Sequence, residues 1–357
     1  MDFSIGDDRQ MLADTMSRFL AKEFGWEKRL KTIETDDGFD RDVWNQMAEL
    51  GVLGALFSED AGGFGGSAFD IGTVFGEVGR AIATGPFLGT LMAGRLLAAA
   101  GEHEVLEGVI SGEKLVTFAH EPAYDAETGK TSDATASGSG DTSTLDGAKG
   151  VVEYLGAADL IVVTAGDKAY FVDASAGGVE KVDYKMVDGG SGGELRLSGA
   201  SAKELSGVDG AAIAETVAAG IVGLTWESVA IMDQLKDQTL EYMRTRKQFG
   251  VPIGKFQALQ HRMATLALEI EQARSAAINT AAYFDKPERD QYCAAGKYTC
   301  ARVGSLAAEE AIQIHGGIGM TWELPLSHYA KRMVMLGHIL GDEDEHLQRY
   351  IELMRAA

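Results

Sequence analysis

The residues best suited to chemistry lie in two stretches near the end of the chain, and the first reads EYMRTRKQFGVPIGKFQALQHRMA at 241–264. Arg246 and Lys247 end a long helical pattern just before Phe249 and Gly250, where the chain must reverse. A guanidinium at such a reversal can bind a phosphate through two parallel hydrogen bonds, and a diphosphate would satisfy it. Cations also favour a helix C-terminus when no ligand is present. The two interpretations explain this motif equally well.

The second stretch, EEAIQIHGGIGMTWELPLSHYAKR, combines an amide side chain with glycines. Gln313 lies in the last turn of a predicted helix, and Gly316, Gly317 and Gly319 follow it. Backbone without Cβ atoms can approach a bulky ligand closely. A glycine that ends a helix, followed by a loop, explains two of these glycines without a ligand. The pairing with Arg246 favours the ligand-binding interpretation.

Other kinds of chemistry find no support in the sequence. The seven histidines show no metal-ligand spacing such as His-Glu-x-x-His. Cys293 and Cys300 lie seven residues apart in a predicted helix, so we expect core packing rather than a disulfide or a metal site. The formal net charge of −22 would repel nucleic acids and anionic membrane surfaces.

Length and composition predict a soluble, cytoplasmic protein with two or three folding units. The chain has 357 residues, 45% of them hydrophobic, and we find no apolar run that approaches the roughly 20 residues of a membrane span. The start, MDFSIGDDRQ, carries acids where a secretory signal would carry a basic and then an apolar segment. Residues 209–357 hold 15 Lys and Arg against 19 Asp and Glu, compared with 32 against 54 in the whole chain. An anionic ligand would therefore bind more readily to the C-terminal part.

Apolar spacing divides the chain into three segments. Residues 1–113 have a helical period, residues 114–208 have the two-residue period of strands, and residues 209–357 return to a helical period. The order predicts an α+β protein with an all-α start, an antiparallel β middle and a helical end.

Individual elements follow from the same patterns. In the first segment we predict helices around 10–24, 41–50, 71–83 and 86–100, with a loop at GGFGGS. In the last segment we predict a helix whose apolar face consists of Leu259, Met263, Leu266, Ile270 and Ala273. A further helix runs from Pro287 to Gly316, and a last helix follows Gly341. Asp146-Gly147 and Gly166-Asp167 predict hairpin turns. The polar segment 124–145 is rich in glycine and serine, so we expect it to be mobile.

Both C-terminal stretches resemble the signatures of the acyl-CoA dehydrogenase family, and the helix–strand–helix plan resembles that family over nearly the whole chain. The segments DGAKGVV, TRKQFGVPIG, FQALQHR and QIHGGIGMT resemble the branch known as the small subunit of pimeloyl-CoA dehydrogenase. The resemblance implies an N-terminal helical domain at 1–113, a middle β-barrel or sandwich domain at 114–208 and a C-terminal four-helix bundle domain at 209–357. It also implies FAD as cofactor, an acyl-CoA thioester as substrate and an electron-transferring flavoprotein as acceptor. Members of the family act on straight-chain, branched, dicarboxylic and steroid side-chain thioesters.

The resemblance also implies a site shared between subunits. In the family an arginine and a glutamine hold the ADP half of an FAD that a neighbouring subunit binds in the main, so we expect a dimer or tetramer. The cofactor contacts carried over are Arg246, Gln248, Phe249, Ile253, Phe256, Gln313, Gly316 and Gly317.

The elements that hold the flavin ring in the family are altered here. The Thr-Glu-Pro and Trp-x-Thr elements read FAHEP and GVVEY, so His120 replaces the first threonine, Val151 the tryptophan and Glu153 the second threonine. A carboxylate at Glu153 would oppose the negative charge that reduction places on the ring. We therefore expect this chain's own β segment to bind a flavin poorly.

The glutamate that removes the α proton in the family is missing at both of its usual places. Counting from Ala330-Lys331 puts Gly337 at one position, and counting back from Arg246 puts Gly220 at the other. Nearby substitutes are His338, Asp342 and Glu343, although acids commonly occupy the first turn of a helix without catalytic roles.

Three hypotheses follow. The chain could be a subunit that supplies Arg246 and Gln313 to FAD while a paralogous partner supplies the glutamate. It could be a self-sufficient homo-oligomeric dehydrogenase with an unconventional base such as Asp342. It could also be a scaffold subunit that supports a partner dehydrogenase and binds no flavin.

Overall fold

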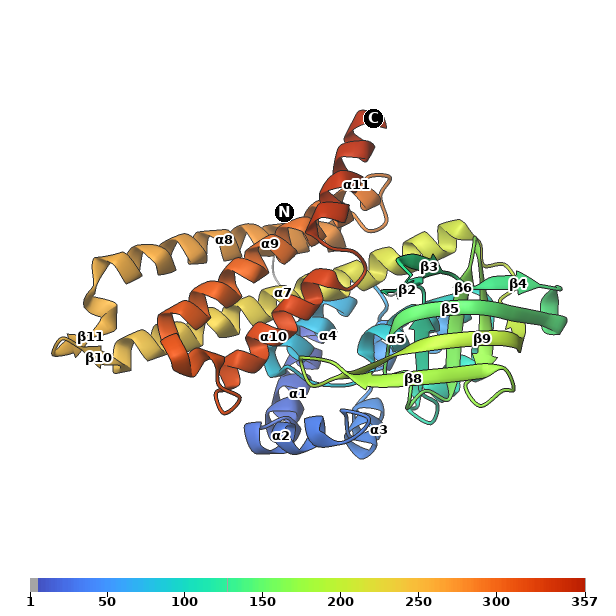
Figure 1. The fold of residues 1–357 in the computed structure, drawn as a ribbon, viewed down its shortest axis with the longest axis horizontal. Helices are drawn as coiled ribbons and strands as arrows, with labels where there is room; N and C mark the ends of the chain where they lie inside the picture. Colours follow the sequence, from blue (N-terminus) through green and yellow to red (C-terminus); the bar gives the residue numbers. More distant parts are fainter. Residues whose placement is uncertain (1–5, 127, 357) are drawn as a thin grey trace. The chain divides into compact units, whose positions relative to one another are not determined.

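The computed structural model describes residues 6–126 and 128–356, and its contacts form two compact units. One comprises Met1–Trp26, Ile71–Ala83 and Ile221–Ala357, and the other comprises Glu27–Asp70 and Thr84–Gly220. Figure 1 shows that helices dominate the first unit and that the strands of the large sheet belong to the second. The predicted α+β class and the order of helices, strands and helices are confirmed.

The first unit is built around α9, which contacts α8, α10 and α11. Its elements are α1 (Asp7–Glu23), most of α4 (Ala68–Ala81), most of α7 (Gly210–Thr245), β10 (Lys247–Gln248), β11 (Val251–Pro252), η4 (Ile253–Lys255), α8 (Gln257–Ala282), α9 (Arg289–His315), η5 (Gly316–Met320), α10 (Pro325–His338) and α11 (Glu343–Ala356). The predicted stripe on α8 forms part of the core, because Met263, Leu266, Ile270 and Ala273 are buried. Both cysteines are free and buried on α9, as core packing predicts.

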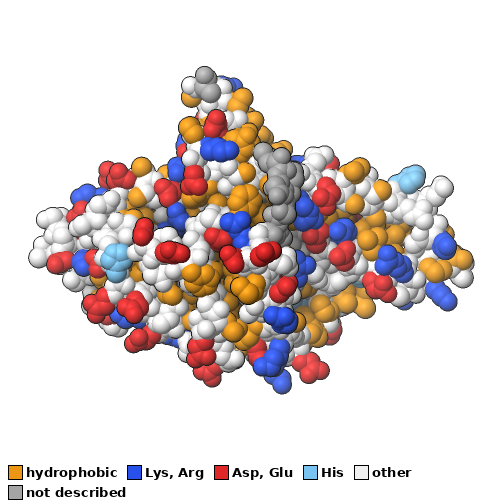
Figure 2. Space-filling model, turned by 180° about the vertical axis from the view of Figure 1, so that it is seen from behind, with side chains coloured by type: hydrophobic (Ala, Val, Ile, Leu, Met, Phe, Trp, Pro, Cys, Tyr) orange, Lys and Arg blue, Asp and Glu red, His pale blue; other side chains and the backbone are white. Residues whose placement is uncertain are grey.

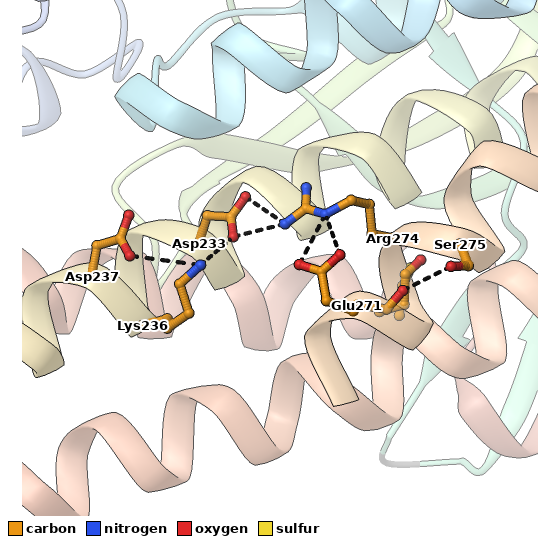
Figure 3. Close-up of polar contacts among 8 residues, drawn as sticks. Asp233, Lys236, Asp237, Glu271, Arg274 and Ser275 are labelled. Atoms are coloured by element: carbon orange, nitrogen blue, oxygen red, sulfur yellow. Dashed lines mark hydrogen bonds and ion pairs between the residues drawn. The ribbon is translucent and has the colours of Figure 1, made fainter. Parts of the chain in front are cut away.

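A half-buried ionic network joins α7 to α8 (Figure 3). Arg274 Nη2 donates to both carboxylate oxygens of Asp233, at 2.8 and 2.9 Å, and Lys236 Nζ donates to the same carboxylate at 2.9 Å. Arg274 Nε also reaches Glu271 at 3.2 Å. The network fixes the pairing of the two helices that flank the β10–β11 hairpin.

Helix α7 is long and apolar enough to cross a membrane, and it is the only such helix in residues 6–126 and 128–356. Within its most apolar window, 83% of the residues are buried inside the structure. The apolar surface of α7 therefore packs as a core helix, which the sequence patterns alone did not single out as a candidate span.

The second unit combines short helices with a curled sheet. Its helical elements are α2 (Trp26–Glu34), α3 (Arg41–Glu49), η1 (Gly54–Leu56), η2 (Glu59–Ala61), α5 (Phe87–Ala99), α6 (His103–Ile110) and η3 (Gly140–Thr142). Its strands are β1 (Val116–Ala119), β2 (Ala123–Asp125), β3 (Lys130–Ser132), β4 (Thr135–Ser137), β5 (Ser143–Glu153), β6 (Leu160–Ala165), β7 (Lys168–Asp173), β8 (Val179–Lys185) and β9 (Ser191–Glu204). The long strand β9 pairs with β5, β7 and β8 and so joins the two halves of the sheet.

The sheet departs from the antiparallel prediction in one place. Strands β1 and β6 pair in parallel, from Val116 opposite Leu160 to Ala119 opposite Val163, whereas the other pairs are antiparallel. The connection from β1 to β6 passes through β2–β5, so hairpin geometry does not constrain this pair. Strand β6 lies between β1 and β7, and its central residues are buried as a continuous run.

One of the two predicted hairpin turns is confirmed and the other is wrong. Gly166 and Asp167 form the two-residue link between β6 and β7. Asp146 and Gly147 instead lie inside β5, at a register shift that marks a bulge. A Cβ on Gly147 would lie 2.1 Å from the carbonyl oxygen of Asp133, so this glycine permits a close approach of two backbones.

Candidate functional site

The two motif stretches meet at one end of the first unit. Arg262 and Glu310 form a two-bond ion pair, with Nε to Oε2 at 2.6 Å and Nη2 to Oε1 at 2.9 Å. Tyr242 stacks on His315 with ring centroids 4.2 Å apart, and its hydroxyl donates to the His315 carbonyl at 3.4 Å. The end of α7, the start of α8 and the end of α9 are thereby fixed together.

Arg246 lies between α7 and β10, and Figure 1 shows the tight β10–β11 hairpin at the end of α7. Its backbone N–H donates to the Tyr242 carbonyl, and its carbonyl accepts from Ile253 N–H at 2.8 Å. Lys247 pairs with Pro252 and Gln248 with Val251, which leaves a two-residue turn. The predicted chain reversal after Arg246 is therefore present.

The turn itself contains an unfavourable residue. Phe249 has φ +55° and Gly250 has φ +82°, which matches a turn that prefers Asn-Gly. Phe249 is 91% exposed, and its ring forms a T-shaped pair with that of Phe256 at a centroid distance of 6.1 Å. A bulky apolar residue with positive φ and full exposure points to a constraint other than the stability of this chain.

The remaining predicted contacts differ in exposure. Arg246, Gln248 and Gln313 are exposed, whereas Ile253 is buried. Ile253 therefore supports the hairpin from inside. No hydrogen bond or ion pair within the described ranges joins Arg246 to Gln313, and the stacked pair of Tyr242 and His315 links their helices.

The glycines after Gln313 end α9 with an open surface. Gly316 has φ +68° and ψ −148°, a conformation that only glycine adopts readily. A Cβ on Gly316 or on Gly317 would meet no described atom within 4 Å. Gly319 is different, because a Cβ there would lie 3.0 Å from His315 Cβ, so it serves packing.

In the second unit, His120 belongs to a buried polar network. Its Nδ1 lies 2.9 Å from Thr164 Oγ1, and Lys149 Nζ donates to the His120 carbonyl at 2.7 Å and to Thr164 Oγ1 at 3.3 Å. Lys149 is only 2% exposed and also pairs with Asp133. Burial, together with the nearby Lys149 ammonium, lowers the pKa of His120 to about 4, although Asp133 opposes this. The imidazole is therefore neutral near pH 7.

Val151 and Glu153 flank the same strand end. Val151 has φ +49° and is 54% exposed, a rare conformation for a β-branched residue. It follows a register shift between Lys149 and Val152 in β5. Glu153 is half-buried, and its carbonyl accepts from Thr117 Oγ1 at 2.6 Å. The backbone of this segment is held firmly, but its side chains are those predicted to disfavour a flavin ring.

Gly337 lies in the last turns of α10 above a buried lysine. Lys297 Nζ donates to the carbonyls of Leu336, Gly337 and Gly341 at 2.9, 3.0 and 2.8 Å. Burial lowers the pKa of Lys297 to about 8. A Cβ on Gly337 would meet no described atom within 4 Å, so the local packing leaves room for a side chain. Gly220, the second position, lies within α7.

The acids considered as substitutes have structural surroundings. Asp342 Oδ1 accepts from Glu345 N–H, and Glu345 Oε2 accepts from Asp342 N–H, both at 3.0 Å. This reciprocal pair caps the start of α11. Glu343 and His338 are exposed. Asp342 as a base stays a hypothesis, and its carboxylate already has a local role.

Four residues of these arrangements were not predicted. The burial of Lys149 and Lys297 was not predicted, because the sequence around a lysine does not show which distant backbone carbonyls will accept hydrogen bonds from it. Tyr242 and Arg262 do lie inside the first motif, and their partners lie inside the second. Because both motifs occur in one chain, the contacts of Tyr242 and Arg262 with residues of the second motif could have been predicted.

The face shown in Figure 2 carries interspersed acidic and basic side chains, with no broad basic area. Within residues 6–126 and 128–356, no group of three or more His, Cys, Asp or Glu is placed to hold a metal ion.

Comparisons with known proteins define the class of molecule. The model of the acyl-CoA dehydrogenase N-terminal domain matches residues 6–113, and that of the C-terminal domain matches residues 210–351. The chain is 30% identical over 347 residues to acyl-CoA dehydrogenase IpdE2 of Mycobacterium tuberculosis, covering 96% of each protein. The chain therefore belongs to the acyl-CoA dehydrogenase family, whose members are oxidoreductases that act on acyl-CoA thioesters.

Solved structures share the fold over the whole chain. The ChsE4-ChsE5 complex from Mycobacterium tuberculosis matches with a TM-score of 0.91 and 24% identity, covering all of both chains. The Tcur3481-Tcur3483 steroid ACAD G363A variant matches with a TM-score of 0.90 and 24% identity, covering 99% of each chain.

Proposed function

We propose that this chain is one subunit of an FAD-dependent enzyme that dehydrogenates an acyl-CoA thioester between its α and β carbons. The chain supplies Arg246 and Gln313 to the cofactor, and a paralogous partner supplies the catalytic base. The observation that carries the proposal is a rigid, exposed pair of motifs in a chain with glycine at both usual base positions.

The end of the first unit fits the ADP half of FAD. Arg246 is exposed, and no ion pair to it occurs among the described residues, so its guanidinium is available to a diphosphate. Gly316 and Gly317 leave the backbone open beside Gln313. The Arg262–Glu310 ion pair and the Tyr242–His315 stack hold these groups in place before any ligand binds.

The second unit does not fit the flavin ring. His120 is engaged with Thr164, and Val151 offers neither the aromatic face nor the hydrogen bond of the residues it replaces. Glu153 adds a carboxylate where reduction would place further negative charge. We therefore assign ring binding to the partner.

The reaction divides between the subunits accordingly. FAD, when bound, accepts the hydride that leaves the β carbon. The residues of this chain bind and orient the diphosphate and hold no proton in the reaction. A base must remove the α proton, and glutamate suits that task when burial raises its pKa.

The self-sufficient alternative is weaker. It requires a base such as Asp342, whose carboxylate forms the cap of α11. The solved structure of the ChsE4-ChsE5 complex contains a chain with this fold, which supports a heteromer. The electron acceptor, an electron-transferring flavoprotein, and a cytoplasmic location are further parts of the proposal.

The proposal is tested by purifying the chain alone and together with the product of a neighbouring reading frame that encodes an intact glutamate. We expect little FAD and no acyl-CoA turnover from the chain alone, and both from the complex. Substantial FAD content and turnover by the isolated chain would refute the proposal that a partner subunit binds the flavin ring and supplies the base. A complex without FAD would favour the scaffold hypothesis.

A further inference from the structure

The glycine-rich segment GGFGGS of the second unit forms a tightly bonded loop that the cofactor site does not use. The N–H groups of Gly63, Gly65 and Gly66 donate to the carbonyls of Ser58, Phe57 and Ala55, each at 2.9 Å. A Cβ on Gly63 would lie 2.3 Å from the Phe57 carbonyl oxygen, and one on Gly65 would lie 2.4 Å from that of Ala55. Only glycine permits this backbone packing.

Gly66 of this loop and the preceding segment 56–61, to which the loop is bonded, form one wall of a pocket of about 320 Å³. The other walls are the end of α5 and the first turns of α7. The apolar lining consists of Leu56, Phe57, Ala61, Gly66, Ala98, Ala99 and Ala212, and the polar lining consists of Ser58, Arg95, Glu215 and Thr216. The volume is at the lower end of the range for small-molecule sites.

The polar lining of the pocket includes a threonine hydroxyl that no side chain or backbone group of the described residues bonds. Thr216 is only 3% exposed, and its hydroxyl forms no hydrogen bond within the part of the chain that the structure describes. The Thr216 hydroxyl is not among the fully buried polar atoms that lack a partner, so it is open to the pocket, where a ligand or a water can bond it. A wall fixed by backbone hydrogen bonds and a nearly buried hydroxyl without a protein partner are features of a binding site.

The charges of the pocket cancel. Arg95 Nη2 donates to Glu215 Oε1 at 2.7 Å, and the two side chains are 19% and 48% exposed. An anionic ligand would have to compete with Glu215 in a chain whose net charge is −22. An uncharged head group can bind beside the ion pair without separating it.

We propose that this pocket binds a small uncharged molecule with an apolar body and a head group that both donates and accepts, such as a carboxamide. The carbonyl of the head group accepts from the Thr216 hydroxyl, and its N–H donates to the Glu215 carboxylate, which has further acceptor capacity. The apolar body packs against Phe57 and Ala98. The site is separate from Arg246 and Gln313 and does not depend on the cofactor assignment.

The test is calorimetric titration of the full chain with benzamide. Thr216→Val keeps the shape of the side chain and removes the hydroxyl, so we expect binding about fivefold weaker. Ala98→Leu fills the pocket, and we expect no binding. Thr225→Val, on the same helix and outside the pocket, is the matched control and should bind as the unmodified chain does. Benzoate should bind more weakly than benzamide.

Several results would overturn the proposal. They are no benzamide binding to the unmodified chain, unchanged binding by Thr216→Val, or tighter binding of benzoate than of benzamide. Thermal unfolding of each variant checks its fold. If Ala98→Leu does not fold, the comparison of Thr216→Val with Thr225→Val decides the question.

Discussion

At the scale of single residues, the structure places ionisable groups where the sequence gave little sign of burial. His120 was identified as a departure from a ring-binding element, and the structure shows what it does instead, which is to join Thr164 and Lys149 in a buried network. Lys297 similarly holds three carbonyls at the end of α10. A buried amine is stable only when such acceptors surround it. Sequence alone does not reveal these acceptors, because distant segments supply them.

The lowered pKa of His120 predicts acid sensitivity. Its pKa falls from 6.5 to about 4 on folding, so the unfolded chain binds the proton more tightly. Stability from this group is complete above pH 6.5 and is lost as the pH falls towards 4, by about 3 kcal/mol at most. We expect the free energy of unfolding in urea to decline over this window in the unmodified chain and to decline less in His120→Gln. Equal declines in both proteins would contradict the role of His120.

At the scale of elements, the hairpin after α7 contains a residue that lowers its local stability. Phe249 adopts a positive φ that asparagine would adopt more easily, and its ring is almost fully exposed. Such a residue is retained when another surface covers it. The motif predicted the chain reversal, but not the exposure of the ring at its tip.

Replacing Phe249 by Asn distinguishes the effect of this residue on the stability of the chain from its effect on the affinity for a partner subunit. Asn-Gly is the preferred pair for this turn, so the melting temperature of the isolated chain should stay the same or rise slightly. Burying a phenylalanine contributes about 1.5–3 kcal/mol, so affinity for the partner subunit should fall by at least about tenfold. Sedimentation of the mixed subunits measures the affinity. Tyr124→Asn, an exposed aromatic residue of β2, is the control, and equal losses for the two variants would count against the hairpin as a contact.

The sequence predicted long elements better than short or paired ones. Helices α1, α3, α4, α5 and α11 lie where the sequence predicted helices. The missed elements are α2, α6, α10, β2, β3, β4 and β8. Apart from the 14-residue helix α10, the missed elements are short, and β8 exposes most of its residues, so it carries little apolar alternation. The bulge at Gly147 and the parallel β1–β6 pair depend on backbones that meet only in the folded unit. The segment 124–145 contains β2, β3 and β4, and its mobility stays a prediction.

At the scale of the whole molecule, the proposed function is that of an enzyme completed by another chain. The net charge is −22, yet residues 209–357 carry 15 of the 32 basic residues, and both predicted diphosphate contacts lie there. The domain limits at 113 and 208 stay predictions. In the proposed function, a cofactor held by the partner reaches these exposed motifs.

The most direct measurement is the FAD affinity of the purified two-subunit complex carrying Arg246→Ala. The side chain is exposed, so the variant should fold and assemble normally, whereas loss of a charged, two-bond contact should weaken FAD binding by about 10–100-fold. Arg246→Lys should give an intermediate affinity. Arg244→Ala, which removes an exposed arginine two residues away that pairs with Glu241, should leave the affinity unchanged. Full FAD affinity in the Arg246→Ala complex would contradict the account.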